Sequence, residues 1–285
     1  MSPLNDARAH GLPDLQPDPA QAPIAAAMLD LMARHRSIRR FSAAPVDLAA
    51  LDQLCARAIA GASSSGNLNL VAIIRSTEPE AKRRLWALHQ EQDMVLEAPV
   101  VLTFCADSHR TRTWLAQRGA RLNFGNFHNW HVAAFDAIIV AQTLALALES
   151  QGLGICYLGT TLSATQGIGE LLGLPDHCVP ATTLVVGHPA EQPAARDRLP
   201  LPAYVHHERY QAHDAAAIDA LYAQREQAGW ARYRALGPEF AARMDALGIT
   251  SLAQFYTSPL KYDPDVHARE SEDLRRELER KGFMP

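Results

Sequence analysis

The chain has 285 residues, of which 48% are hydrophobic, so it can bury a full core as one large domain or two small ones. Its formal net charge of -4 and its pI near 6.3 argue against general nucleic-acid binding, because nucleic-acid-binding domains are normally basic. The four cysteines lie far apart among apolar neighbours, without the spacing of a metal site. They predict reduced, buried thiols in a cytoplasmic protein.

The N-terminal part of the chain leads into a strongly basic segment. Residues 1–22 are rich in proline and indicate a loose arm, and a helix is predicted from Pro23. The basic segment, His35–Phe41, then places three arginines, a histidine and a serine within seven positions. Such a density of donors suits a phosphate. The alternative is a solvated basic helix end.

A second predicted helix, capped by Asp47, precedes a polar loop at residues 61–69 and a short strand at Val71–Arg75. A Ser/Gly/Asn loop is usually a plain connector, although a polar loop at the mouth of a sheet is also a common ligand site. A further helix from about Pro79 to Gln90 is followed by an apolar strand at Pro99–Ala106, of the kind that is buried on both faces.

The least regular part of the sequence is residues 107–131. A helix from about Trp130 to Ser150 follows it and is apolar nearly all round, which predicts a central core helix. Its longest apolar stretch is broken by polar residues, so no run is expected to reach the length of a membrane span. The irregular part holds a cluster of aromatic and imidazole side chains: Trp114, Phe124, Phe127, His128, Trp130 and His131.

The rest of the chain alternates short strands with helices. After a left-handed cap at Gly152, strands are predicted at Ile155–Gly159 and Thr182–Gly187, with a helix at about 164–172 between them. Beyond them, two arginines on alternate residues of an extended segment, Arg196 and Arg198, would project to the same side. Residues 214–236 and 265–282 are predicted to be helices. This order indicates a mixed α/β layer architecture of the α+β class.

Six motifs, in order, carry a resemblance to a known family. They are His35-Arg36-Ser37-Ile38-Arg39…Phe41, Ser63-Ser64-Ser65…Asn67-Leu68-Asn69, Phe104-Cys105-Ala106-Asp107, Glu149–Gly159, Gly187-His188-Pro189-Ala190 and Arg196–Pro200. Together they cover residues 24 to 210 and resemble the nitroreductase / FMN reductase family, closest to its oxygen-insensitive, NADPH-preferring branch. The resemblance implies a nitroreductase-like fold, with a mostly antiparallel sheet flanked by helices, and an intertwined homodimer that binds FMN non-covalently at its interface.

The resemblance also implies roles for particular residues. The phosphate of FMN would meet His35, Arg36, Ser37, Arg196 and Arg198, and the pyrimidine edge of the flavin would meet Arg39. The loop residues along the flavin would be Ser64, Ser65, Asn67 and Asn69, with Gln92 contacting the ring and Tyr157, Leu158 and Gly159 beside N5. The substrate pocket would be lined by Phe124, Phe127, His128, Trp130 and His131. Ordinary core and helix-entry packing is the alternative for these five.

The chemistry of flavin agrees with these roles. Guanidinium groups match phosphate oxygens in pairs, and a cation beside the pyrimidine edge would stabilise the anionic reduced flavin. The flavin itself carries the hydride, so no catalytic residue of the protein and no metal are expected. The implied function is an FMN-dependent NAD(P)H oxidoreductase that reduces nitroaromatic compounds or quinones by a ping-pong mechanism. Alternatives are an NAD(P)H-dependent free-flavin reductase and a non-enzymatic helical interaction protein.

The implied organisation has three parts, and the sequence departs from the family within them. Residues 1–22 would be the arm, 23–210 the FMN-binding domain and 211–285 a helical C-terminal extension. Residues 108–131 resemble an insertion that could cover the flavin, and Asn69 stands where the family often has glutamine. The loop expected to hold the NADPH 2′-phosphate is not evident, and Arg225, Arg232 and Arg234 are only candidates for it.

Overall fold

The structure is a computed structural model and describes residues 18–285. The described chain forms two compact units. The larger unit comprises His35–Ala194 and Glu270–Pro285, and the smaller one comprises residues 18–34 and Ala195–Arg269. The predicted limits of the FMN-binding domain, 23–210, and of the helical extension, 211–285, stay a prediction. Most of the predicted N-terminal arm lies outside the described residues.

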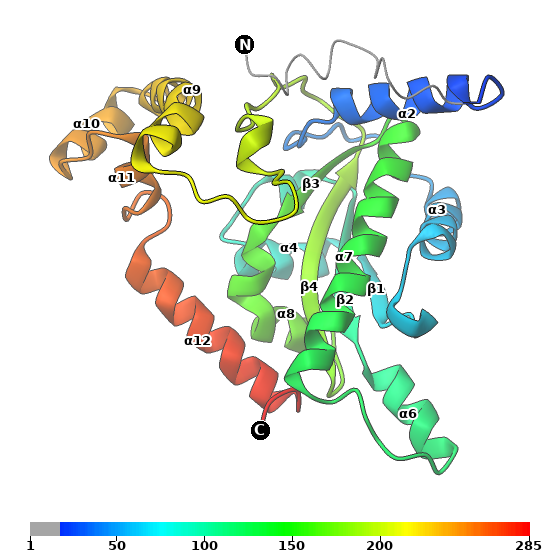
Figure 1. Ribbon diagram of the computed structural model, residues 1–285. Coiled ribbons are helices and arrows are strands. Elements are labelled where there is room, and N and C mark those ends of the chain that lie inside the picture. Colours follow the sequence, from blue (N-terminus) through cyan, green and yellow to red (C-terminus); the bar gives the residue numbers. More distant parts are fainter. Residues whose placement is uncertain (1–17) are drawn as a thin grey trace. The chain divides into compact units, whose positions relative to one another are not determined.

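A four-stranded sheet forms the centre of the larger unit. Its strands are β1 (Val71–Ser76), β2 (Val100–Asp107), β3 (Gly154–Leu158) and β4 (Cys178–Gly187), in the spatial order β1-β2-β4-β3. Each neighbouring pair is antiparallel. The predicted fold class, an α+β fold with an antiparallel sheet and flanking helices, is therefore confirmed (Figure 1).

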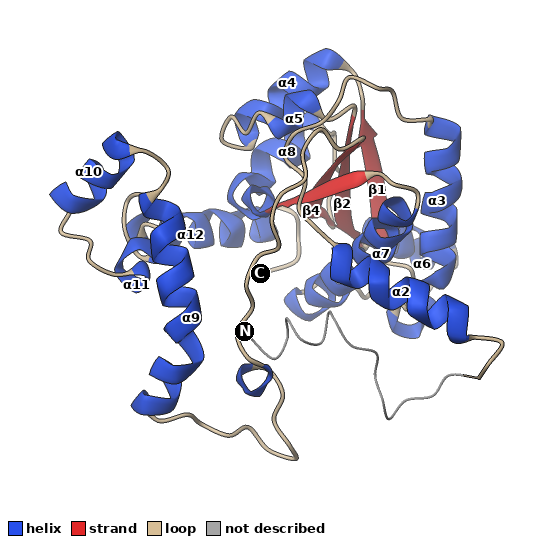
Figure 2. Cartoon of the chain, turned by 90° about the horizontal axis from the view of Figure 1, so that it is seen from above, coloured by secondary structure: helices blue, strands red, loops and turns tan. Residues whose placement is uncertain are grey.

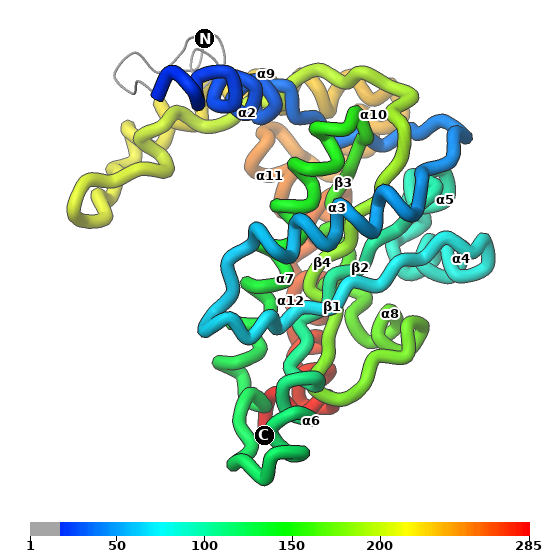
Figure 3. The backbone as a smooth tube through the Cα atoms, turned by 90° about the vertical axis from the view of Figure 1, so that its right-hand side faces the viewer, coloured from blue at the N-terminus to red at the C-terminus, as the bar shows by residue number. Residues whose placement is uncertain are grey.

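Helices cover both faces of this sheet because its inner strands are apolar on both sides. One face packs on α3 (Leu48–Gly61) and α7 (Phe127–Ser150) through buried residues such as Leu102 and Leu184. The other face packs on α4 (Pro79–Leu88), α5 (Met94–Glu97) and α8 (Thr165–Leu171) through residues such as Val101 and Val185. Figure 2 shows the two groups of helices on opposite sides of the strands, and Figure 3 shows α3 crossing in front of the sheet.

The α7 helix is longer than predicted and is covered on one side only. Its 24 residues have the length and hydropathy of a membrane-spanning helix, so the prediction that no segment reaches that length is wrong. Leu144 and Leu148 are fully buried against the sheet, which identifies α7 as a core helix. Phe135, Ile138 and Ile139, however, are exposed in the larger unit. The prediction of a helix buried all round is therefore only half correct.

The segment predicted to be irregular contains a helix, α6 (His109–Gln117), and this prediction is corrected. Polar residues dominate α6, and of its nine residues only Thr111 is buried, so no apolar stripe marks it in the sequence. The end of the chain also belongs to the larger unit. There Leu278 and Phe283 pack on Val179 of β4, and the ammonium group of Lys281 donates to the carbonyl of Leu174.

The smaller unit is helical. It contains α2 (Ala22–Arg34), η3 (Leu201–Ala203), α9 (Ala215–Arg234), α10 (Pro238–Ala246), α11 (Leu252–Tyr256) and the first turns of α12 (Pro264–Arg280). The helix predicted from Pro23 and those predicted at 214–236 and 265–282 are confirmed, whereas α10 and α11 were not predicted. Its small core is formed by Met244, Ile249, Leu252 and Phe255. A Cβ at Gly229 of α9 would lie 2.5 Å from Leu252, so this glycine permits close packing of α11.

Candidate functional site

The basic segment follows the end of α2 as an extended chain along the free edge of β3. Ser37 forms a parallel bridge with Ile155, and the backbone amide of Ile38 donates to the carbonyl of Ile155 at 2.9 Å. Gly154 allows this approach, because a Cβ there would lie 2.8 Å from the Ile38 side chain. The segment is therefore a fixed part of the sheet edge, and the helix-end alternative is not what the structure has.

Two carboxylates hold this segment from behind. Glu149, at the end of α7, accepts a 2.6 Å hydrogen bond from Nδ1 of His35, which turns Nε2 of the imidazole away from it. Glu191 accepts from the backbone amides of Arg39 at 2.5 Å and Arg40 at 3.2 Å. Neither glutamate was assigned a role from the sequence. Their effect is to position the donors of the segment.

The arginines of the basic segment differ in what their guanidinium groups contact. Arg40, to which no role in the cofactor site was assigned, forms an ion pair with Glu97 at 3.0 Å. Arg39 is exposed, its guanidinium donates to the carbonyl of Ser37 at 3.3 Å, and among residues 18–285 it has no carboxylate partner. Arg36 donates to the carbonyl of His35 at 2.7 Å. Arg39 thus keeps a cationic group that an anion can reach.

The polar loop after α3 is held by a carboxylate that the sequence analysis missed. Asp136 of α7 is buried, with 2% exposure, and accepts from the Ser64 hydroxyl at 2.6 Å, the Ser65 amide at 3.2 Å and the Leu70 amide at 3.0 Å. A lone aspartate in an apolar helix is the signal that could have indicated this role, since a buried carboxylate must be paired. The loop is therefore fixed at both ends.

Two asparagines at the tip of the loop have left-handed backbones. Asn67 and Asn69 have φ values of 54° and 53°, a region in which asparagine is enriched. The side-chain amide of Asn69 donates to the carbonyl of Asn67 at 2.8 Å, and its backbone amide donates to the Ser64 hydroxyl at 2.8 Å. Arg110 of α6 binds the Asn69 carbonyl. The predicted cover segment thus supports the loop through its helix.

The end of β3 combines a buried and an open part. The side chain of Leu158 is buried, with 2% exposure, so only its backbone is available to a ligand. A Cβ built at Gly159 would meet no atom within 4 Å. The hydroxyl of Tyr157 donates to Gln142 at 3.2 Å, and burial, with the nearby charge of Glu149, raises its pKa to about 12. Tyr157 is therefore a neutral phenol near pH 7.

A polar corner lies beside this strand end and includes the predicted residue Gln92. Its side-chain amide donates to the carbonyl of His89 at 3.0 Å and to the hydroxyl of Thr160 at 3.2 Å. Thr160 directly follows Gly159, so the structure brings Gln92 and the β3 end together. Neither His89 nor Thr160 was identified from the sequence.

The second arginine pair belongs to the smaller unit. Arg196 and Arg198 are exposed, and among the described residues neither forms an ion pair. Asp197 lies between them in the sequence, is half-buried and pairs with Arg225 at 3.4 Å and Arg232 at 3.5 Å. That Arg196 and Arg198 project to the same side stays a prediction. Their proximity to the basic segment stays a prediction.

The three arginines considered for the NADPH 2′-phosphate are engaged in ion pairs. Arg225 and Arg232 bind Asp197, and Arg234 binds Asp245. A phosphate would have to compete with these carboxylates for their guanidinium groups. The structure therefore gives no support to these candidates.

Three of the five predicted substrate residues, Phe127, Trp130 and His131, form an aromatic cluster at the start of α7. The rings of Phe127 and Trp130 are stacked with centroids 5.6 Å apart, and His131 meets Phe127 edge-on at 4.5 Å. Trp130 packs on the buried Leu70, which favours the core-packing alternative for it. Phe127 and His128 are exposed, and Phe124 has a left-handed backbone with φ 63°. A substrate-binding role for the cluster stays a prediction.

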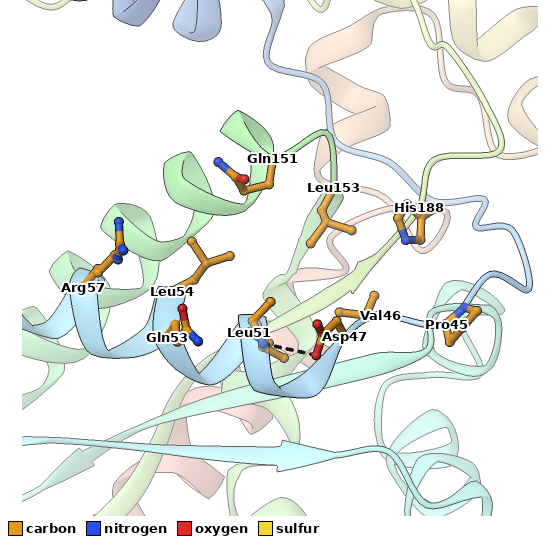
Figure 4. A pocket seen from close by; sticks show the side chains of 11 residues that line it. Pro45, Val46, Asp47, Leu51, Gln53, Leu54, Arg57, Gln151, Leu153 and His188 are labelled. Carbon is orange, nitrogen blue, oxygen red and sulfur yellow. Dashed lines mark hydrogen bonds between the residues drawn. The ribbon is translucent and has the colours of Figure 1, made fainter.

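A pocket of about 440 Å³ lies elsewhere in the larger unit. Its wall is formed by α3, the end of α7 and the chain beside β3 and β4, and Figure 4 shows the side chains of Leu54, Leu153 and His188 around it. None of the residues predicted for a cofactor or a substrate lines this pocket. It is therefore not the candidate site.

Comparison with known proteins gives a consistent result. Residues 32–188 match the model of the nitroreductase family. The chain is 34% identical over 184 residues to an FMN reductase (NADPH) of Bacillus subtilis, with 64% of this chain and 74% of the relative covered. It is 33% identical over 183 residues to an oxygen-insensitive NADPH nitroreductase of Salmonella typhimurium, with the same coverage. Among solved structures, NADPH:FMN oxidoreductase of Vibrio harveyi, complexed with NAD⁺, superposes with a TM-score of 0.71 at 27% identity, covering 90% of this chain and 98% of the other.

Proposed function

Because this chain belongs to the nitroreductase family, we propose that it is an FMN-dependent NAD(P)H oxidoreductase that reduces nitroaromatic compounds or quinones. An NAD(P)H-dependent free-flavin reductase, for which flavin is a substrate, is the second candidate, since the Bacillus subtilis relative is named an FMN reductase. Both functions need an FMN site formed by this chain.

The observation that carries the proposal is the basic segment held at the edge of β3. Glu149 and Glu191 bind an imidazole and two backbone amides, whereas the guanidinium of Arg39 has no carboxylate partner among the described residues. A fixed imidazole, a serine hydroxyl and a guanidinium without a carboxylate partner among the described residues form a donor set that fits a phosphate or an electron-rich ring edge. The open side of Gly159 fits the close approach of a flat ring. The residues present therefore fit FMN.

In this proposal the chain binds and orients the cofactor. His35, Arg36 and Ser37, with Arg196 and Arg198, would hold the phosphate, and Arg39 would face the pyrimidine edge. The loop Ser64–Asn69 would lie along the ring, fixed by Asp136. Bound FMN supplies hydride transfer at its N5, with NADH or NADPH as the reductant. The role of the protein is to place a positive charge beside the ring, where it favours the reduced state of the flavin.

We also infer a homodimer, in which the exposed side of α7 would be covered. Phe135 is 62% exposed, and Ile138 and Ile139 lie beside it in the larger unit without cover. Exposed apolar residues gathered on one helix face are typical of protein interfaces. Sedimentation of the purified protein should give the mass of two chains, and a monomer at micromolar concentration would contradict this inference. The free cysteines support a place in the reducing cytoplasm.

Purification and rapid kinetics test the function. The protein should be yellow or should quench the fluorescence of added FMN, and NADPH or NADH should bleach the bound flavin in a stopped-flow experiment. An oxidant such as a quinone should then restore the colour. Turnover that requires added free FMN, and not a quinone, would favour the free-flavin reductase. A colourless protein that is unaffected by FMN would contradict both functions and leave the interaction-protein alternative.

A further inference from the structure

The corner at Gln92 is held in an uncommon backbone conformation. The α4 helix ends at Leu88, and the next turn places Gln90 and Glu91 at φ values of 57° and 55°. Two successive left-handed residues that are not glycine are uncommon and cost conformational energy, so the surroundings must maintain them. Such strain is often found where a protein holds a ligand, and the turn delivers Gln92 to the end of β3.

The orientation of the Gln92 side-chain amide is determined by its partners. A backbone carbonyl can only accept a hydrogen bond, so the group that faces the His89 carbonyl at 3.0 Å must be the amide nitrogen. The same nitrogen donates to the Thr160 hydroxyl at 3.2 Å. The opposite atom, Oε1, forms no hydrogen bond within residues 18–285, and Gln92 is only half-buried. Gln92 therefore presents an acceptor.

A buried histidine keeps this arrangement in place. The His89 ring is inaccessible to solvent, and its Nδ1 lies 2.8 Å from the hydroxyl of Thr160. Burial lowers the pKa of His89 to about 4, so the imidazole is neutral near pH 7. Either neutral tautomer leaves the Thr160 oxygen able to accept from Gln92. His89 therefore orients the side-chain amide of Gln92 in two ways. Its backbone carbonyl accepts from that amide directly, and its ring contacts the Thr160 hydroxyl that accepts from the same amide.

We propose that His89 and Thr160 are positioning residues that turn Oε1 of Gln92 toward the N3–H group of the flavin ring. N3–H is the N–H donor of oxidised flavin, and an acceptor fixed in advance would recognise it at low entropic cost. This inference rests on the proposed function, because it concerns the same FMN site. The contact of Gln92 with the ring is implied by the family resemblance, and the inference adds the orientation of its side chain, which is set by two residues that need not touch the flavin.

The test compares FMN with its N3-methyl analogue, which keeps the phosphate but lacks the N3–H donor. The apoprotein is titrated with each ligand, and quenching of flavin fluorescence gives two dissociation constants. We expect the wild-type protein to prefer FMN by about tenfold, the scale for a buried acceptor left without a donor. Thr160→Val removes the hydroxyl at nearly constant shape and should reduce the preference to about threefold or less. Thr160→Ser should restore it.

Each other outcome has a definite meaning. Equal affinity of the wild-type protein for both ligands would overturn the proposal, and so would an undiminished preference in Thr160→Val, because steric exclusion of the methyl group would then explain it. Failure of the wild-type protein to bind either ligand would instead contradict the proposed function. Should Thr160→Val not fold, His89→Leu carries the same test, since it removes the ring that contacts Thr160.

Discussion

Two sets of polar groups in this chain differ in burial and in their partners within the protein. The inner set, Asp136 and His89, is buried: Asp136 accepts three hydrogen bonds, and His89 contacts Thr160 through Nδ1, while its Nε2 has no partner among residues 18–285. The outer set, Arg39 with Arg196 and Arg198, is exposed and has no carboxylate partner among the described residues. Removing a buried partner leaves other buried groups unpaired, whereas removing an exposed cation does not. The inner set should therefore control stability, and the outer set should control ligand affinity.

The largest effect is expected at Asp136. Asp136→Ala would leave the amides of Ser65 and Leu70 and the hydroxyl of Ser64 without their acceptor, and should lower the free energy of unfolding by about 4 kcal/mol. Urea denaturation of the apoprotein measures this change. Asp52→Ala is the matched control, because Asp52 forms an exposed pair with Arg75 and should cost less than about 1 kcal/mol. Equal losses in the two variants would show that the inner set is not special.

His89 should make stability depend on pH. Its pKa is about 4 in the folded protein, against 6.5 for an unperturbed histidine, so the unfolded chain binds the proton more readily between these values. The contribution is complete above about pH 6.5 and is lost as the pH falls to 4, with a total of about 3 kcal/mol. Urea denaturation at several pH values should show this loss in the wild-type protein and a smaller one in His89→Gln. A difference between the two proteins that stays constant with pH would contradict it.

These two residues also show where sequence reasoning ends. Asp47 and the apolar strands were predicted correctly, because capping and hydrophobic runs are local patterns. Asp136 meets Ser64 across 72 positions and His89 meets Thr160 across 71, and no local pattern reports such contacts. The α6 helix was missed for a different reason, since it lacks an apolar stripe. The candidate donors could therefore be named from local motifs, whereas the groups that hold them could not.

The outer set should affect FMN binding without affecting stability. Arg39→Ala and Arg198→Ala should each weaken the binding of FMN by about 2 kcal/mol, which raises its dissociation constant roughly thirtyfold, through loss of a charged hydrogen-bond partner. Arg40→Ala is the control within the same segment, because Arg40 is already paired with Glu97. Fluorescence titration measures the affinities, and thermal unfolding checks that stability is unchanged. If Arg40→Ala weakens the binding of FMN as much as Arg39→Ala does, then the presence of a carboxylate partner does not decide which arginine binds FMN.

The smallest effect concerns Glu191, which belongs to neither set because its charge and its hydrogen bonds act in opposite directions. Its carboxylate accepts from the amides of Arg39 and Arg40 and so fixes the basic segment, but its negative charge opposes an anion nearby. Glu191→Gln keeps an acceptor and removes the charge, so it should bind FMN at least as tightly as the wild-type protein. Glu191→Ala removes both the acceptor and the charge and should weaken the binding of FMN by about 1 kcal/mol, the scale of a hydrogen bond.

Salt separates the two contributions of Glu191, since screening reduces the charge effect and leaves the hydrogen bonds. Any gain in affinity of Glu191→Gln over the wild-type protein should therefore shrink when FMN titrations are repeated at high ionic strength, while the loss in Glu191→Ala should persist. Equal weakening in both variants would mean that the carboxylate charge itself is needed to hold the segment. Glu191 would then resemble Asp136 in function despite its partial exposure, and burial would no longer separate the groups that build the site from those that bind the ligand.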